Sequence, residues 1–518
     1  MLSATTIWIA FALYMCFLLA VAIYVTAKEK RQKQGGSLLT ASVSWPILVM
    51  TYIASLMSTW VFFAGPGAYY RGGMGYWLSE MSYIALFPFI AHFTMNKVWI
   101  INQQKQGSFV TPADFFYERY KSPALRAILG VIFLACSFPY IASVLVAIAQ
   151  AAQFATDGAI NYRMAVIVVG LIMTIFVCVG GVKSAATADT IQGLLFITLL
   201  WVIVICCLIV GFHGSLAAAV STLWNNPDTK SFFSYPGPSG WAPYGARFGY
   251  PFSCAIGWTI MLPHVFVRSG YFGDNLKAQR KLSFMTPILQ AIVWTGTMLI
   301  GLVGLALVSN MTASESELII PFMVKNFVLG YSPVMAKILM VGFFVGASAV
   351  GLSTSNAFLA TASGIVSSDL LKNTFHLKVS EKNEKNVSRV IIAALGIISI
   401  IIAIDPPDLI FTLIMFSIAL VMPLFSVLVF GLYWKRATKQ AAIVSSIVGT
   451  ILVLMTYFVW NIGGTWYGAI GLLGSTITMV LVSLVTHQDP KDSESFFEAL
   501  EAGMKRFYVV KEKKSAAK

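Results

Sequence analysis

Residues 50–73, MTYIASLMSTWVFFAGPGAYYRGG, place hydroxyl groups and helix-breaking residues inside an apolar segment. Ser55, Ser58 and Thr59 interrupt the apolar run, and Gly65-Pro66-Gly67 is expected to break it further along. In hydrocarbon, an opened helical turn is tolerated only where it lines a cavity or is buried in protein. Its freed carbonyls and the hydroxyls could bind an ion or a small solute. A helix-packing face of small residues explains the same pattern.

A second hydroxyl-rich segment, GASAVGLSTSNAFLATASGIVSSDLL, contains Ser353, Thr354 and Ser355 in consecutive positions. Sodium prefers oxygen ligands, and hydroxyls together with freed carbonyls can supply several of them without a carboxylate. The alternative is that each hydroxyl donates back to the carbonyl four residues earlier. If two such segments face each other, they would form a sodium site.

Few ionisable residues occur deep in the apolar segments, where such groups are costly and usually functional. Glu80 is one, and we expect it to be buried. His264 and Arg268 end another segment just after Pro263, which should break the helix. A simple kink with a positive anchor explains these residues equally well. Asp189 begins a further segment, where it either contacts an ion or only caps the helix.

The elements that carry these residues are expected to be membrane helices. The chain has 518 residues, of which 58% are hydrophobic and 11% charged. Apolar runs of about 20 residues recur along nearly its whole length, which is typical of a polytopic membrane protein. We predict an all-α transmembrane domain over residues 1–486 with about thirteen spans. The spans lie roughly at 5–27, 43–66, 74–98, 124–152, 161–180, 190–212, 248–268, 283–308, 333–362, 388–404, 408–434, 440–460 and 465–486.

The basic residues predict the orientation. Lys28, Lys30 and Arg31 follow the first span, so the N-terminus should lie outside. All but six of the 35 lysines and arginines then fall in cytoplasmic loops or in the C-terminal tail. This bias indicates a protein of the plasma membrane, surrounded by lipid, and it explains the net charge of +14 without nucleic acid. The six exceptions are Arg71, Arg163, Lys230, Arg247, Lys325 and Lys337.

Several function classes find no support. We find no phosphate-binding loop, no His/Cys metal cluster and no nucleophile–base motif, so neither an enzyme nor an ATP-driven pump is expected. The six cysteines lie in apolar segments and suggest no disulfide framework. The parts outside the membrane are small, and no obligate protein partner is predicted. They are a short cytoplasmic helix PADFFYERY at 112–120, an outer loop at 213–247 with the turn signals NNPDTK and YPGPSG, and an amphipathic tail at 487–518.

Five stretches, in order along the chain, resemble the sodium:solute symporter family, which includes proline, pantothenate, monocarboxylate and glucose symporters. The Pro-His…Arg ending is similar to the proline, pantothenate and monocarboxylate branch rather than the sugar branch. The stretches are Ala54-Ser55-Leu56-Met57-Ser58 with Gly65-Pro66-Gly67, Pro112-Ala113-Asp114-Phe115-Phe116 with Arg119-Tyr120, Gly180-Gly181 with Asp189-Thr190-Ile191-Gln192, Pro263-His264 with Arg268, and Ser353-Thr354 with Ser363 and Asp369-Leu370.

The resemblance implies a LeuT-like core of two inverted five-helix repeats, at about 43–212 and 248–434, with one discontinuous helix in each. It assigns Asp189 to the cytoplasmic ion path, where Pro263 and Glu80 are further candidates for the path or a gate. Leu56 departs from the proline branch, which has an acid there, so acid-assisted sodium entry is in doubt. The implied sodium ligands are the carbonyls of Ala54, Met57 and Val350 and the hydroxyls of Ser353 and Thr354.

The solute is expected near the membrane midplane, between spans 2, 4 and 7. Small side chains at 255 and 259, where the proline branch has aromatic ones, suggest a cavity larger than proline needs. A half-helix N-terminus and hydroxyls could hold a small carboxylate without a buried cation. We therefore expect an organic acid, such as a monocarboxylate, or an amino acid. The lining candidates are Ser58, Trp60, Tyr140, Ala255, Trp258, Thr259 and Leu262.

The predicted function is secondary active transport: symport of a small organic solute with sodium by alternating access. Two alternatives stay open. One is a proton-coupled or uncoupled carrier with the same fold. The other is a transporter-like membrane sensor that signals through the tail.

Overall fold

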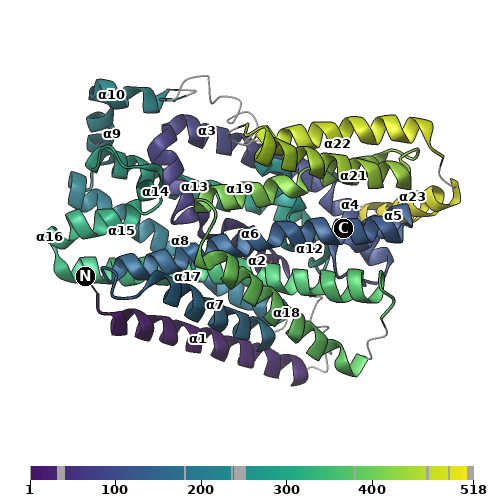
Figure 1. Ribbon diagram of the computed structural model, residues 1–518, viewed down its shortest axis with the longest axis horizontal. Helices are drawn as coiled ribbons and strands as arrows, with labels where there is room; N and C mark the ends of the chain where they lie inside the picture. The colour runs from purple at the N-terminus through teal and green to yellow at the C-terminus, as the bar shows by residue number, and fades with distance from the viewer. Residues whose placement is uncertain are drawn as a thin grey trace, which may run out of the picture.

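The computed structural model describes residues 2–31, 41–179, 182–234, 237–238, 253–377, 381–462, 466–487 and 490–509. Over these residues every regular element is a helix, apart from one isolated bridge between Val43 and Gly273 (Figure 1). In this part of the chain, ten helices are long and apolar enough to cross a membrane, and three shorter apolar helices accompany them. The all-α membrane class is confirmed. The count of thirteen spans stays a prediction.

The helices of the N-terminal half lie over the predicted spans, although α3 begins ten residues before residue 74 and α8 begins eight residues before residue 190. They are α1 (Ala4–Arg31), α2 (Trp45–Met57), η1 (Thr59–Val61), α3 (Ala64–Phe93), α4 (Met95–Gln104), α5 (Pro112–Tyr120), α6 (Pro123–Ala155), α7 (Tyr162–Val179) and α8 (Val182–Phe212). The loop that follows, which is predicted to lie outside, contains α9 (Leu216–Asn225), α10 (Pro227–Lys230) and η2 (Ser231–Phe233). NNPDTK was expected to be coil, but Asn226 accepts from the Asp228 amide and caps the short helix α10. YPGPSG lies largely outside the described residues.

The C-terminal half repeats the pattern of long helices with short connections. It begins with η3 (Ser253–Met261), α12 (Pro263–Tyr271), α13 (Leu276–Leu307), α14 (Ala313–Ser316), α15 (Ile319–Met323), η4 (Val324–Val328) and α16 (Leu329–Tyr331). It continues with α17 (Pro333–Gly364), η5 (Ile365–Lys372), α18 (Glu381–Ile404), α19 (Ile410–Val421) and α20 (Leu424–Tyr433). It ends with α21 (Lys439–Leu454), η6 (Met455–Val459), α22 (Trp466–Val485), α23 (Pro490–Met504) and η7 (Lys505–Val509).

Three segments form the interior of the bundle. Residues 51–70 of α2, η1 and α3, 140–149 of α6 and 346–359 of α17 are buried without interruption. A helix that is buried on all sides, rather than along one stripe, lies inside a protein. Figure 1 shows α2, α6 and α17 in the middle, with α1 along one edge and α21 and α22 along the other. Any polar group on these segments is therefore shielded from both lipid and water.

The two predicted helix interruptions are present. The first lies at Ser58, whose φ of 54° and ψ of −178° end α2 before η1 begins. The second lies at Leu262, between η3 and Pro263, the first residue of α12. Because proline has no amide hydrogen, it cannot donate to the carbonyl of Thr259, four residues earlier. The hydroxyl of Tyr52 donates a hydrogen bond to that carbonyl instead, at 2.5 Å. This bond connects α2 to η3 at the break.

Gly65-Pro66-Gly67 does not interrupt a helix, contrary to expectation. These residues lie in the first turn of α3, where proline is tolerated because early amides have no helical partner. Gly67 instead allows a close approach: a Cβ there would lie 2.9 Å from the Ser316 carbonyl oxygen of α14. Between the second and third predicted spans, at residues 66–74, we expected a connection outside the membrane. In the structure α3 continues through these residues and is kinked at Gly73, whose φ is 63°.

Helices α14, α15 and α16 pack against α3, α13 and α17, at the end of the bundle that is predicted to face outside. Arg71 of α3 donates to the Ala313 carbonyl at 3.0 Å and to the Ser316 hydroxyl. Glu317, which follows α14, accepts from the Phe411 amide at 3.1 Å and so caps the N-terminus of α19. These contacts tie the cover to both α3 and α19.

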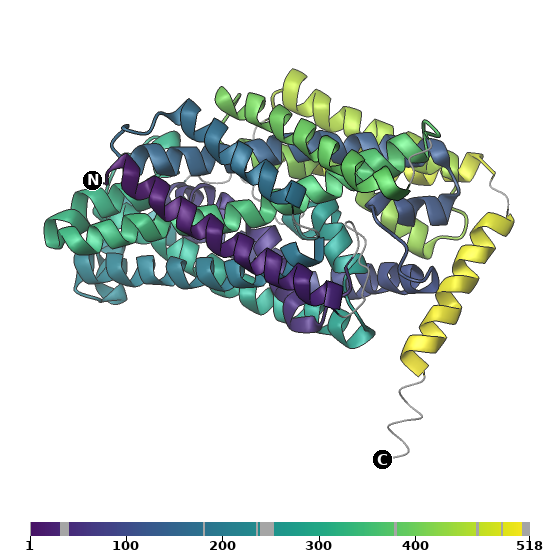
Figure 2. The same ribbon diagram turned by 90° about the horizontal axis from the view of Figure 1, so that it is seen from below.

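At the opposite end, α5 and α23 pack against the ends of the long helices. Helix α5 forms as predicted, with Thr111 and Asp114 in a capping box. Arg119 donates to the carbonyls of Gly431 at 2.7 Å and Trp434 at 3.2 Å, where α20 ends. The predicted tail helix is α23, and Figure 2 shows it at the end of the molecule away from the N-terminus. The orientation in the membrane stays a prediction.

Candidate functional site

The broken end of α2 meets α17 through one hydroxyl. Thr354 Oγ1 donates to the Val350 carbonyl at 3.0 Å and also lies 3.5 Å from the carbonyl oxygen of Ala54. The hydrogen bond from Thr354 to the carbonyl four residues earlier is the alternative to ion binding that the sequence left open, and it is present. The same hydroxyl nevertheless brings three of the five proposed sodium ligands together. Met57, the last residue of α2, is completely buried, and its carbonyl as a ligand stays a prediction.

A buried polar cluster lies next to Thr354. Ser353 Oγ donates to Asp189 Oδ1 at 2.8 Å, and Thr51 Oγ1 donates to Asp189 Oδ2 at 2.5 Å. Arg268 Nη2 approaches the same Oδ2 at 3.2 Å, while its Nε donates to Thr51 Oγ1 at 3.2 Å. The side chains of Asp189 and Arg268 are 1% and 3% exposed. The carboxylate therefore has hydrogen bonds on both oxygens and a buried counter-charge.

Asp189 does not cap a helix. It lies in the second turn of α8, which begins seven residues earlier at Val182. The interpretation as an N-terminal cap is therefore wrong, and the role of Asp189 on the cytoplasmic ion path stays a prediction. Arg268, predicted only as the end of a span, is its partner.

Two hydroxyl oxygens of this region are available as cation ligands. The hydrogens of Ser353 and Thr354 are used toward Asp189 and toward backbone carbonyls, so their lone pairs remain free to bind a cation. Among the described residues, no group of three or more His, Cys, Asp or Glu side chains could hold a metal ion. The donor set is thus neutral oxygen, which suits a monovalent cation better than a transition metal.

A small cavity of about 10 Å³ lies beside Arg268, with room for about one water molecule. It is lined by Val110, Ala185, Val267, Arg268, Phe272, Asn356, Ala360 and Thr361. Because its lining includes Ala185 near the start of α8 and Val110 in the loop before α5, it lies on the side of Arg268 that is predicted to be cytoplasmic.

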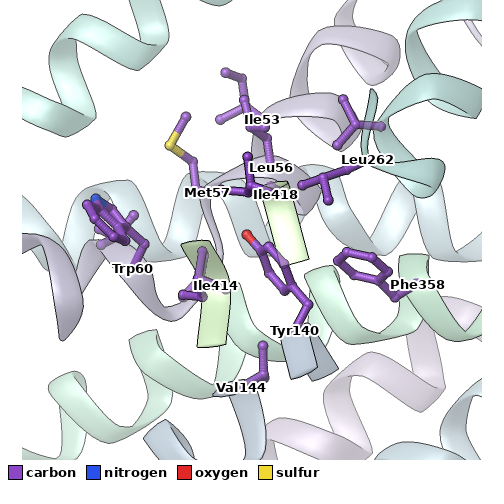
Figure 3. Packing of buried hydrophobic residues seen from close by; sticks show 14 of the residues in the cluster. Ile53, Leu56, Met57, Trp60, Tyr140, Val144, Leu262, Phe358, Ile414 and Ile418 are labelled. Carbon is purple, nitrogen blue, oxygen red and sulfur yellow. The ribbon is translucent and has the colours of Figure 1, made fainter. Parts of the chain in front are cut away.

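The predicted solute positions adjoin the break in α2. Figure 3 shows Tyr140 and Leu262 facing Leu56, with Trp60 nearby. The Tyr140 ring lies 4.7 Å from that of Phe358. Ser58 and Thr259 are fully buried, whereas the side chains of Ala255 and Trp258 lie outside the described residues. Glu80 is buried in α3, downstream of the Gly73 kink, and its role in gating stays a prediction.

Sequence reasoning did not single out all the neighbours of these positions. Figure 3 shows Ile414 and Ile418 of α19 and Phe358 of α17 beside Tyr140. All three are ordinary apolar residues of a span, so nothing in the sequence marks them. His264 was noted only as part of a helix end. Its position directly after Pro263 is the signal that places it at the break.

A comparison with family models covers most of the chain. The model of the sodium:solute symporter family matches residues 38–449. The chain belongs to the sodium:solute symporter family. Its closed polar cluster, broken helices and all-helical bundle are therefore those of a membrane transporter.

Curated relatives of this symporter cover most of its length. A sodium/pantothenate symporter of Haemophilus influenzae is 28% identical over 448 residues, which is 84% of this chain and 87% of the relative. The osmoregulated proline transporter OpuE of Bacillus subtilis is 24% identical over 478 residues, covering 88% of this chain and 89% of the relative.

Solved structures show the same fold at lower identity. A sodium-coupled sialic acid symporter in a substrate-bound outward-open state has a TM-score of 0.74 at 18% identity, over 93% of this chain and 97% of the other. MhsT in complex with L-phenylalanine has a TM-score of 0.55 at 13% identity, over 89% and 99%. The LeuT-like fold that the resemblance implied is confirmed. The division into repeats at 43–212 and 248–434 stays a prediction.

Proposed function

We propose that this protein imports a small organic acid or amino acid across the plasma membrane by symport with sodium. The observation that carries the proposal is the contact of Thr354 with Ala54. It joins the hydroxyl pair of α17 to the broken end of α2, beside a cluster of solute candidates. Family membership gives the general activity, and this contact supports the proposal that the ion binds between α2 and α17.

Sodium would be held by neutral oxygens at this contact. The hydroxyls of Ser353 and Thr354 and the carbonyls of Ala54, Val350 and Met57 are the proposed ligands. Asp189 would act indirectly, without binding the ion itself. It accepts the hydrogen bond from the Ser353 hydroxyl, so the lone pairs of that hydroxyl point away from Asp189 and toward the ion. Arg268 balances the charge of Asp189, so the carboxylate does not itself require the transported cation.

Sodium and solute would be coupled through α2. The ion would fix the last turn of α2, which contains Leu56, a neighbour of the solute candidates Tyr140 and Leu262 in Figure 3. If bound sodium favours the solute-binding shape of this turn, bound solute favours sodium by the same factor. Each inward sodium would contribute about 2.3 kcal/mol per 100 mV of membrane potential to accumulation.

A carboxylate is the preferred solute group. The hydroxyls of Ser58 and Thr59 are fully buried and make no hydrogen bond to any described residue. Two such donors at a helix break suit a carboxylate oxygen. Pantothenate, proline and sialic acid, which the names of the relatives specify, are carboxylic acids. The solute would lie between these hydroxyls and Tyr140.

The test is uptake into proteoliposomes from a panel of amino acids and organic acids, with and without a sodium gradient. We expect uptake of at least one acid to require sodium. Uptake without sodium that follows a pH gradient would favour the proton-coupled alternative instead.

The double variant Ser353→Ala/Thr354→Ala should raise the sodium concentration for half-maximal uptake by roughly tenfold or more, since each tenfold corresponds to about 1.4 kcal/mol of lost binding. Ser399→Ala is the matched control, because Ser399 is a buried hydroxyl that bonds back to the Leu395 carbonyl in α18, away from the site. An unchanged sodium requirement at normal membrane abundance would reject this sodium site.

A further inference from the structure

His264 is the polar side chain at the second helix break. It follows Pro263 in the first turn of α12 and is completely buried. Its ring lies 3.8 Å from the Phe358 ring and 6.3 Å from the Tyr140 ring, measured between centroids. Both aromatic residues border the candidate solute region (Figure 3). His264 therefore lies against the two aromatic residues that border the candidate solute region.

The hydrogen bonding of His264 fixes which ring nitrogen carries the hydrogen. Nε2 lies 3.1 Å from the carbonyl oxygen of Ser55. A carbonyl oxygen can only accept, so Nε2 must be the donor. In the neutral ring, Nδ1 then has no hydrogen and is an acceptor. The charged group nearest along the same helix is Arg268, which donates to the His264 carbonyl at 3.4 Å and is itself paired with Asp189.

Nδ1 of His264 has no partner within the described part of the chain. The atom is buried and makes no hydrogen bond there. A buried acceptor without a partner loses its bond to water and gains nothing in return. Such an atom at the wall of a binding region gains its partner when a ligand with a donor arrives.

We propose that Nδ1 of His264 accepts a hydrogen bond from an N–H or O–H group of the solute. The transported class is then a small organic acid that carries such a donor, for example a hydroxy acid or an amino acid. Plain carboxylates without a donor are poor solutes. This inference rests on the proposed function, because it names the substrate class of the same site.

The same residue links solute and ion. Ser55, which receives the Nε2 hydrogen, directly follows Ala54, whose carbonyl faces Thr354. Formation of a bond at Nδ1 polarises the imidazole and strengthens the Nε2 bond to α2. His264 thus acts as a specificity residue through Nδ1 and as a positioning residue for α2 through Nε2.

Two substitutions separate the two nitrogens. His264→Gln can place an amide N–H near the position of Nε2 and retain the bond to Ser55, while it removes the acceptor. His264→Asn can place an amide oxygen near the position of Nδ1 and retain the acceptor, while it loses the bond to Ser55. His487→Gln is the matched control, since His487 is exposed beyond α22.

The experiment measures competition in proteoliposomes and binding to the purified full chain. The probes are pairs of acids that differ by the donor: lactate against propionate, and proline against cyclopentanecarboxylate. In the wild type, at least one donor-bearing acid should bind tenfold or more tightly than its partner. His264→Gln should reduce that ratio to below about threefold with little change in sodium requirement. His264→Asn should keep the ratio and raise the sodium requirement.

Several results would overturn the assignment. They are equal binding of both members of each pair, binding of the donor-free acid alone, binding of neither member, or an unchanged ratio in His264→Gln. Thermal unfolding of each variant shows whether the chain is folded, and a misfolded Gln variant leaves the ratio in the Asn variant and in the wild type as the deciding measurements. Sodium-independent binding with a clear donor preference would reject the proposed symport while leaving the role of Nδ1 intact.

Discussion

The hydroxyl of Ser353 in α17 donates to the carboxylate of Asp189 in α8 over 2.8 Å, with both side chains buried. The two residues are 164 positions apart in the chain. Their contact places a charged residue immediately behind a candidate ion ligand. It also makes the ion pair of Asp189 with Arg268 part of the frame that holds the site.

Replacing Asp189 alone should be more harmful than replacing the pair. In Asp189→Asn, the guanidinium of Arg268 stays buried without its counter-charge, which costs about 3–5 kcal/mol of stability. In the double variant Asp189→Asn/Arg268→Gln, no charge is left behind, so part of that stability should return. Thermal unfolding of the purified protein measures both. A double variant no more stable than the single one would show that the two charges are not coupled.

Ser58 has a backbone conformation that glycine adopts more easily. A φ of 54° with ψ of −178° belongs to a region that is essentially restricted to glycine and costs about 1–3 kcal/mol. Both Ser58→Gly and Ser58→Ala remove the hydroxyl, but only glycine relieves the strain. The Gly variant should therefore unfold at a higher temperature than the Ala variant. The reverse order would mean that α2 does not end in this conformation.

Glu317 should make stability depend on pH. Burial raises the pKa of Glu317, although the Phe411 amide and Arg71 act in the opposite direction. The folded state holds the proton of Glu317 more tightly than the unfolded state does. The free energy of unfolding should therefore fall as the pH rises from about 4.5, the ordinary pKa of the group, through the raised pKa in the folded protein. Glu317→Gln keeps an acceptor for the Phe411 amide but cannot ionise. Its melting temperature should equal that of the wild type near pH 4 and exceed it at pH 7.5. An equal difference at both pH values would count against Glu317 as the cause.

The tail helix should contribute stability rather than transport. Phe496 of α23 is 1% exposed and lies 5.9 Å from the Phe115 ring of α5. Phe496→Ala should cost about 3 kcal/mol, within the range for a buried aromatic residue, whereas Glu498→Ala on the exposed side should cost little. Unfolding measures the cost. Deletion of residues 493–518 should lower membrane abundance and leave sodium-driven uptake per molecule intact. Normal abundance with altered signalling and no transport defect would favour the sensor alternative.

The sequence predicted which helices are interrupted more reliably than where. Hydroxyls and a Gly-Pro-Gly run occur together in span 2, and either could have ended the helix. The break falls at Ser58 because residues 65–67 occupy the first turn of α3, where proline costs no hydrogen bond. Asp189 was ambiguous for a related reason. The start of α8 at Val182 has no capping signal in the sequence that separates it from a start near residue 189.

The roles of His264 and Arg268 could not be predicted from their surroundings in the sequence. His264 meets Ser55, which is 209 positions away, and Arg268 meets Asp189, which is 79 positions away. Local pattern shows that a polar residue lies in an apolar run, but it does not show its partner. Ile414 and Ile418 pose the opposite difficulty, since a buried apolar residue beside Tyr140 resembles, in the sequence, an apolar residue that faces lipid.

The pairing of Asp189 with Arg268 has an electrical consequence. A symporter has to reset after it releases its cargo, and the empty protein crosses the same field as the loaded one. Two opposite charges that travel together add nothing to the work of that reset. Asp189 and Arg268 would then make no net contribution to the voltage dependence of that reset.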